Sequence, residues 1–149
     1  MLVGGVAIKD QANVRGRSLA DRLAEAFAEY AHYVVRTEIW GYSPDEDDDP
    51  QRLIAEDYRG IRPAPGYPAC PDHTEKSTLF RLLDCEANCG VSLTDSFAML
   101  PTATVGGWYF SHPEAKYFSV GTIEMDQVDS LAARKSMSAP ELASWLAPV

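Results

Sequence analysis

The sequence predicts an α+β domain in which helices are packed around a central antiparallel β-meander. Two observations support this class. Apolar residues recur at helical spacing in the first part of the 149-residue chain and again at its end, whereas short aromatic and β-branched segments gather between residues 91 and 125. Because helices and strands are grouped rather than alternating, α+β is favoured over α/β.

The first predicted helix covers residues 18–41. Ser18 and Asp21 resemble a capping box, and Gly41 marks the end. Apolar residues three or four apart predict one stripe along this helix, made of Leu19, Leu23, Phe27, Tyr30, Ala31, Val34 and Val35. Residues 1–17 are assigned no element, and residues 18–149 are predicted to form one domain.

Two further helices are expected before the strands. In residues 49–58, Asp49 can cap a short helix whose first position suits Pro50. A longer helix is expected from near Asp72 to Gly90. The acidic run at 45–49 is interpreted as a solvated loop, because the ligand spacing and glycine of a calcium loop are missing.

Residues 91–100, 104–112 and 116–125 are predicted to be the three strands of the meander. Their connections are too short for a parallel crossover, which indicates antiparallel neighbours. The chain is then expected to return to helix in residues 125–136 and 138–148, the second beginning with a capping box of Ser138 and Glu141.

Composition limits the partners of this domain. The formal net charge is −9, and no basic patch is present, so we expect no nucleic-acid partner. No apolar run approaches the ~20 residues of a membrane-spanning helix, and the first residues lack the pattern of a secretory signal. Three cysteines, an odd number, favour a reducing cytoplasmic environment over a disulfide framework.

Side chains for acid–base or nucleophilic catalysis are not grouped in any recognisable motif. The sequence contains no G-x-S-x-G elbow and no glycine fingerprint for phosphate, so no catalytic residue is predicted. Cys70, His73, Cys85 and Cys89 could form a structural zinc site. The competing interpretation is that Cys85 and Cys89 are small residues of an amphipathic helix, and we therefore predict no metal site.

The stretch "GIRPAPGYPACPDHTEK" at residues 60–76 is the strongest candidate for a binding site. Its four prolines fix the backbone, which lowers the entropy lost when the segment orders around a ligand. Arg62 offers a guanidinium for a carboxylate or phosphate, Gly66 permits close backbone approach, and Tyr67 offers an aromatic wall. The alternative is a covered connector between two helices.

Three segments together resemble one known family. "RPAPGYPACPDHTEK", "SFAMLPTATVGGWYFSHPEAKYFSVG" and "LADRLAEAFAEY" are similar to the C-terminal activation domain of cobalamin-dependent methionine synthase, over about Leu19 to Pro148. The resemblance implies part of a C-shaped α+β fold that binds S-adenosylmethionine. It also implies a role in reductive methylation, in which oxidised cob(II)alamin is returned to methylcobalamin.

The resemblance also implies which residues bind the ligand. It assigns S-adenosylmethionine contacts to Arg62, Ala64, Gly66, Tyr67, Tyr117 and Phe118. A second tyrosine is common in the family where this chain has Phe118. Glu25 and Glu56 are weaker candidates, as carboxylates favouring the cationic ligand, and the alternative for both is a solvated helix face.

The expected partners follow from the same resemblance. They are the cobalamin-binding domain of methionine synthase, which would hold the cobalamin, and flavodoxin or another reductase. The family domain is longer, and its upstream half supplies further ligand contacts. We therefore expect this chain to be a fragment or split subunit that is not catalytic alone. The alternative is a non-catalytic interaction module that docks a cobalamin-binding protein.

Overall fold

The computed structural model describes residues 2–7 and 14–146. Its helices and strands are, in chain order, β1 (Leu2–Ala7), α1 (Val14–Val34), η1 (Val35–Ile39), α2 (Pro50–Ile54), α3 (Glu75–Leu83), α4 (Cys85–Cys89), β2 (Ser92–Leu93), β3 (Met99–Leu100), β4 (Thr104–Tyr109), α5 (Met125–Lys135) and α6 (Ala139–Trp145). Mixed helices and small antiparallel sheets confirm the predicted α+β class.

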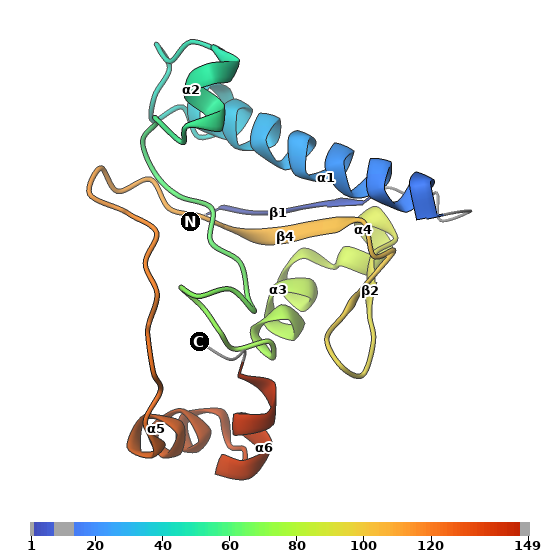
Figure 1. Cartoon of the computed structure of the whole chain (residues 1–149), viewed down its shortest axis with the longest axis vertical. Helices are drawn as coiled ribbons and strands as arrows, with labels where there is room; N and C mark the ends of the chain where they lie inside the picture. Colours follow the sequence, from blue (N-terminus) through green and yellow to red (C-terminus); the bar gives the residue numbers. More distant parts are fainter. Residues whose placement is uncertain (1, 8–13, 147–149) are drawn as a thin grey trace.

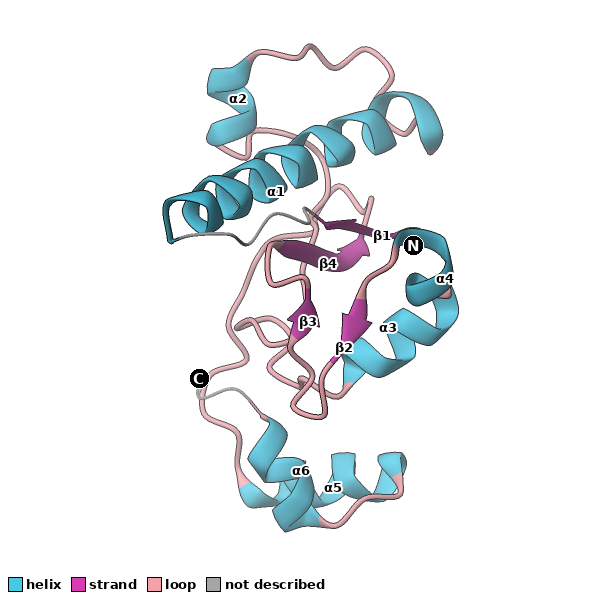
Figure 2. Cartoon of the chain, turned by 90° about the vertical axis from the view of Figure 1, so that its right-hand side faces the viewer, coloured by secondary structure: helices cyan, strands magenta, loops and turns pink. Residues whose placement is uncertain are grey.

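A two-stranded ribbon of β1 and β4 lies in the middle of the molecule (Figure 1). Helix α1 runs along one side of this ribbon, and α3 lies on the other side (Figures 1 and 2). Residues 110–124 form a long connection, here called the strap, that leads from β4 to the α5–α6 pair at the far end. Val128, Ala132 and Leu142 form the small core of that pair.

The predicted three-stranded meander is wrong in its strand pairing. Strand β4 pairs antiparallel with β1, with Leu2 opposite Tyr109 and Ala7 opposite Thr104, whereas β2 and β3 form a separate short hairpin. Residues 116–123 contain no strand. The aromatic residues that suggested a third strand instead lie on the exposed strap, so β-propensity alone was misleading there.

The predicted helices are present, with altered boundaries. Helix α1 begins at Val14 and β1 lies at Leu2–Ala7, so regular structure reaches into the segment to which no element was assigned. The helix expected from Asp72 to Gly90 is broken at Asp84, which has φ of +46° and separates α3 from α4. Ser138 accepts a hydrogen bond from the Glu141 amide, as expected of its capping position.

The apolar stripe of α1 was predicted to face the core, and for its larger side chains this is wrong. Leu19, Leu23, Phe27 and Tyr30 are all more than half exposed, whereas Ala31 and Val34 are half-buried and only Val35 is buried. The buried side of α1 carries the small residues Ala20, Ala24 and Ala28. Alanine lets a helix approach a neighbouring element closely, so small side chains rather than large ones mark the packed face here.

The acidic run is the expected exposed loop except at Glu46, which is partly buried. Glu46 pairs with the fully buried Arg36, and the Asp49 side chain accepts a hydrogen bond from the Gln51 amide at the start of α2. Arg52 binds Asp47 and Asp57 on the surface.

In the described ranges, no helix is both long and apolar enough to cross a membrane.

Candidate ligand-binding site

The proline-rich turn is attached to strand β4. Ile61 and Phe110 exchange two backbone hydrogen bonds, and the Trp108 amide donates to the Pro63 carbonyl at 3.0 Å. Gly107 makes this contact feasible, because a Cβ there would lie 2.6 Å from the Pro63 oxygen. The backbone of the turn is therefore fixed from the ribbon side.

The strap holds the turn from the opposite side. The Arg62 amide donates to the Tyr117 hydroxyl at 3.0 Å, and the Val120 amide donates to the Pro68 carbonyl at 3.0 Å. Gly66 has φ of +91° and packs against the His73 ring, which a Cβ would strike. Segments more than fifty residues apart in sequence are thus brought to one place.

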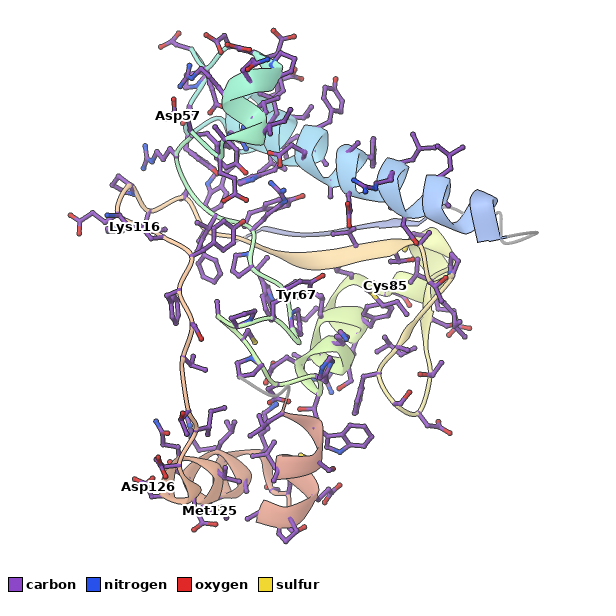
Figure 3. The ribbon with its side chains drawn as sticks, in the orientation of Figure 1. Asp57, Tyr67, Cys85, Lys116, Met125 and Asp126 are labelled. Atoms are coloured by element: carbon purple, nitrogen blue, oxygen red, sulfur yellow. The ribbon has the colours of Figure 1, made fainter. Side chains whose placement is uncertain are left out.

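A cleft of about 1020 Å³ opens beside this turn, and all six residues implied by the resemblance line it. They are Arg62, Ala64, Gly66, Tyr67, Tyr117 and Phe118. Figure 3 shows Tyr67 in the turn, on the α3 side of the β1–β4 ribbon. Glu25 and Glu56 also line the cleft, although their residues are exposed. The size is that of a small-molecule site, and the role of each residue in binding stays a prediction.

Protein side chains hold part of the Arg62 guanidinium. One terminal nitrogen binds Glu29 at 2.5 Å, and the other donates to the Tyr58 hydroxyl at 2.8 Å and contacts Nδ1 of His32 at 3.5 Å. Burial by itself lowers the pKa of Arg62. The hydrogen bond to Glu29 and the charges of Tyr58 and Glu29 outweigh it, so the pKa of Arg62 is raised overall. Its side chain remains 22% exposed, so a permanent cation lies at the edge of the cleft.

His32 is fully buried behind Arg62 and is neutral at ordinary pH. Its ring stacks on Tyr109 at a centroid distance of 4.9 Å and meets Tyr58 edge-on. Burial first, and then the charges of Arg36 and Arg62, lower the pKa of His32 to about 3. No motif in the sequence involves this histidine.

The charge of the cleft lining suits a ligand that carries both signs. Asp21, Glu25 and Glu56 contribute carboxylates, while Arg62 and Lys76 contribute cations. Burial lowers the pKa of Lys76, and burial followed by the Lys76 charge lowers that of His73, which also lines the cleft. Three exposed aromatic rings at its mouth, those of Tyr67, Tyr117 and Phe118, could cover a flat heterocycle or a cation.

A second cleft, of about 1030 Å³, lies between the strap, strand β4 and helix α5. Pro63, Ala69 and Phe118 line both clefts and therefore form the wall between them. The remaining lining of the second cleft is mostly apolar and includes Trp108 and Phe110. None of the other five residues assigned to the ligand lines it.

The cysteines and His73 do not assemble into a zinc site. Cys85 and Cys89 lie in α4, where the Cys89 thiol donates to the Cys85 carbonyl, and Cys70 lies in the turn. Across the residues that the structure describes, no three His, Cys, Asp or Glu side chains are placed to hold a metal ion. The geometry therefore gives the zinc alternative no support.

Fold and cleft together define an α+β domain with a cleft of small-molecule size between a proline-rich turn and an aromatic strap. The chain is similar to a solved structure described as the MetH reactivation domain bound to AdoHcy, with 58% identity and a TM-score of 0.84. The match covers 87% of this chain and 40% of that one.

The family model for the activation domain of vitamin B12-dependent methionine synthase matches residues 7–136. The chain therefore belongs to this activation-domain family.

Sequence reasoning missed the residues that surround Arg62. Glu29 lies 33 positions before Arg62 in the chain and resembles the other surface glutamates of an amphipathic helix. Tyr58 and His32 also belong to no recognisable sequence motif. Helical spacing gives a weak signal for Glu29, because it follows the cleft-lining Glu25 by four residues and residues four apart are neighbours on a helix.

Proposed function

We propose that this chain binds S-adenosylmethionine in the cleft beside the proline-rich turn and supports reductive methylation of cobalamin in methionine synthase. The observation that carries this proposal is the convergence of all six implied residues on one cleft. The similar MetH reactivation domain was solved with AdoHcy, which is the product left when S-adenosylmethionine donates its methyl group. The family assignment supports the same activity.

The residues of the cleft would bind and orient the methyl donor. Free N–H groups of Arg62 would bind the ligand carboxylate, since Nε has no hydrogen-bond partner among the described residues. Carboxylates of Glu25 and Glu56 would favour the cationic sulfonium, and Tyr67 would cover the adenosyl group. Cobalamin held by the partner domain would supply the nucleophile that accepts the methyl group.

This assignment requires no catalytic acid or base from the chain. The sulfonium methyl is already electrophilic, so holding it in line with its acceptor is the main contribution of the protein. The cleft is open along Tyr67, Tyr117 and Phe118, whose side chains are exposed. A partner carrying the acceptor could therefore approach from that side, with a reductase such as flavodoxin supplying the electron in a cytoplasmic setting.

A ligand titration monitored by saturation-transfer NMR tests the proposal. Because the similar structure has a longer chain, we expect S-adenosylmethionine and AdoHcy to bind this chain alone more weakly than micromolar. Arg62→Ala should abolish the signal, and Arg81→Ala, an exposed arginine on α3 outside the cleft, should leave it unchanged. No signal from the unsubstituted chain at millimolar ligand would refute the proposal. Ordinary micromolar binding would show that the upstream half is dispensable.

A second function is favoured by one specific contact set. Glu29, Tyr58 and His32 already bind the Arg62 guanidinium, as they would if Arg62 only stabilised the fold of a non-catalytic module docking a cobalamin-binding protein. Reactivation assays with Arg62→Ala separate the two functions. Loss of methyl transfer with docking intact supports ligand binding, whereas unchanged reactivation supports the docking module.

A further inference from the structure

The α5–α6 pair has its own small core and stands apart from the β1–β4 ribbon (Figures 1 and 2). The second cleft, of about 1030 Å³, lies between helix α5 and strand β4, and Val128 and Leu131 of α5 line it. Across this space, apolar packing does not hold the helix against the ribbon. The position of the pair, and with it the far end of the strap, must therefore be fixed by other contacts.

A group of polar side chains at the end of α5 supplies such contacts. Lys135 Nζ lies 2.6 Å from Oδ2 of Asp72 and 2.5 Å from Oε1 of Glu75. The same ammonium group donates to the Thr74 hydroxyl at 2.7 Å, and we call these four residues the Lys135 cluster. The side chains of Lys135 and Asp72 are only 19% and 8% exposed, so solvent screens this pair less than a surface pair.

Lys135 remains a cation in this setting. Burial by itself lowers its pKa, but the hydrogen bonds and charges of Asp72 and Glu75 outweigh burial, so the pKa of Lys135 is raised overall. The cluster therefore keeps its attraction over the ordinary pH range.

The partners of Lys135 lie where the proline-rich turn ends and α3 begins. Oδ1 of Asp72 accepts hydrogen bonds from the Thr74 amide at 2.8 Å and the Thr74 hydroxyl at 2.7 Å, which fixes the Asp72 carboxylate. The His73 amide donates to the Trp145 carbonyl at 3.1 Å, so α6 is attached to the same short stretch. Because His73 also lines the ligand cleft, both helices of the pair are joined to the wall of that cleft.

The strap depends on how its ends are held. Residues 112–122 contain no helix or strand, and nearly all of them are exposed. Among the described residues, two hydrogen bonds join this stretch to the turn, one through the Tyr117 hydroxyl and one through the Val120 amide. A segment with so few contacts opens locally at little cost in free energy. The positions of Tyr117 and Phe118 at the ligand cleft therefore depend on the anchors at the two ends of the strap.

We propose that Lys135 is a positioning residue for ligand binding, which fixes the far end of the strap and so keeps Tyr117 and Phe118 at the ligand cleft. Lys135 lines neither of the two clefts and acts through α5, a rigid helix that begins directly after the strap. The role in ligand binding rests on the proposed function, whereas the mechanical link between Lys135 and the strap does not.

Amide hydrogen exchange of Lys135→Met, measured by NMR without ligand, tests the mechanical link. The Val120 amide, which donates to Pro68, should exchange about tenfold faster, because loss of the anchor lets this end of the strap open locally. The Phe110 amide, at the other end of the strap, donates to Ile61 and should keep its exchange rate. Equal acceleration of the two amides would indicate a general loss of stability and would overturn the proposal, as would unchanged exchange at Val120.

A titration with AdoHcy tests the role in ligand binding. In Lys135→Met the dissociation constant should rise roughly three- to tenfold, because the apparent affinity falls with the fraction of molecules whose strap is in the binding-competent position. Lys135→Arg, which keeps the cation, should restore most of the affinity. A dissociation constant that Lys135→Met leaves unaltered would contradict the positioning role.

Arg134→Met is the matched control. Arg134 is the adjacent cation of α5, but it is exposed, and its guanidinium donates to the Ser130 carbonyl of its own helix rather than to the cluster. We expect this variant to leave both the Val120 exchange rate and the dissociation constant unchanged. Effects as large as those of Lys135→Met would show that positive charge near the strap, and not the cluster, is responsible, and the proposal would fail.

A milder variant covers the case in which Lys135→Met does not fold. Glu75→Gln removes one carboxylate of the cluster and leaves Lys135 paired with Asp72. It should shift both measurements in the same direction by a smaller factor, and no shift in either would refute the proposal. If the unsubstituted chain binds no AdoHcy, the proposed function fails, and the exchange rates of Val120 and Phe110 alone decide whether the link exists.

Discussion

Two arginine–glutamate pairs lie near His32, and they differ in their access to solvent. The Arg36 side chain is 0% exposed and its partner Glu46 is 9% exposed, whereas Arg62 and Glu29 are each 22% exposed. Arg36 also lies 3.8 Å over the Tyr58 ring, away from the cleft. Only Arg62 lines the cleft, with N–H groups left for a ligand.

The difference teaches that an ion pair alone does not identify a binding residue. Arg36 is enclosed with Glu46, so its pair joins the end of α1 and η1 to the acidic run and has no free face for a ligand. Arg62 is held by Glu29, Tyr58 and His32 but also lines the cleft. We therefore expect changes at Arg36 to affect stability and changes around Arg62 to affect binding.

Arg36→Met is expected to have the largest effect. Removing the cation leaves Glu46 nearly buried and unpaired, and breaking such a pair costs about 3–5 kcal/mol. Urea denaturation followed by circular dichroism measures the free energy of unfolding. Arg36→Met with Glu46→Leu should recover much of the loss, because no buried charge remains. A loss below about 1 kcal/mol for the single variant, as for a surface pair, would contradict the structural role of Arg36.

Acid should destabilise the fold through His32. The pKa of His32 falls from 6.5 in the unfolded chain to about 3 in the folded one, so between these values only the unfolded chain binds the proton. The free energy of unfolding should therefore decrease as pH falls below 6.5, by about 1.4 kcal/mol per pH unit and about 2 kcal/mol by pH 5.

Urea denaturation at a series of pH values measures this dependence. His32→Gln should flatten it, while His112→Gln, an exposed histidine on the strap, should not. Equal slopes for the unsubstituted chain and His32→Gln would show that folding does not lower the pKa of His32.

Glu29→Gln is expected to have a smaller effect on stability, about 1 kcal/mol, because the pair with Arg62 is partly solvated. The neutral amide keeps the shape but no longer fixes the guanidinium, so ligand affinity should fall by about fivefold, or about 1 kcal/mol. Ligand titration by NMR measures this against Glu86→Gln, an exposed glutamate on α4. Unchanged affinity with reduced stability would show that Glu29, like Glu46, stabilises the fold without contributing to ligand binding.

Tyr117→Phe should have the smallest effect. It removes the hydroxyl that accepts the Arg62 amide hydrogen bond at 3.0 Å, while the exposed ring remains. A single neutral hydrogen bond contributes about 0.5–1.5 kcal/mol, and partial exposure places this one at the lower end. Amide hydrogen exchange at Arg62 reports the loss directly, and unaltered exchange would show that the strap is not held through this contact.

Sequence alone predicted which residues line one cleft better than it predicted the packing. Arg62, Gly66 and Tyr67 lie within six residues of one another in one proline-rich turn, so a local motif was enough to group them. Tyr117 and Phe118 were linked to that turn only by the resemblance, and the structure brings both to the same cleft. Glu29, Tyr58 and His32 reach Arg62 through tertiary contacts, for which local sequence carries no signal.

The fold shows the same division. Helix starts at Asp49 and Ser138 were predictable because a capping side chain acts within a few residues. The partner of β4 was not predictable, because β1 lies about a hundred residues earlier in the chain. The orientation of α1 was also mistaken, since helical spacing identifies an apolar stripe without telling which neighbour covers it.

The position of bound ligand tests the account most directly. A crystal structure of this chain grown with saturating AdoHcy should show the ligand between the turn at 62–67 and Tyr117, with its carboxylate on Arg62. Ligand density in the other cleft, beside Trp108 and Phe110, would contradict the assignment, as would an Arg62 side chain that makes no contact with the bound molecule.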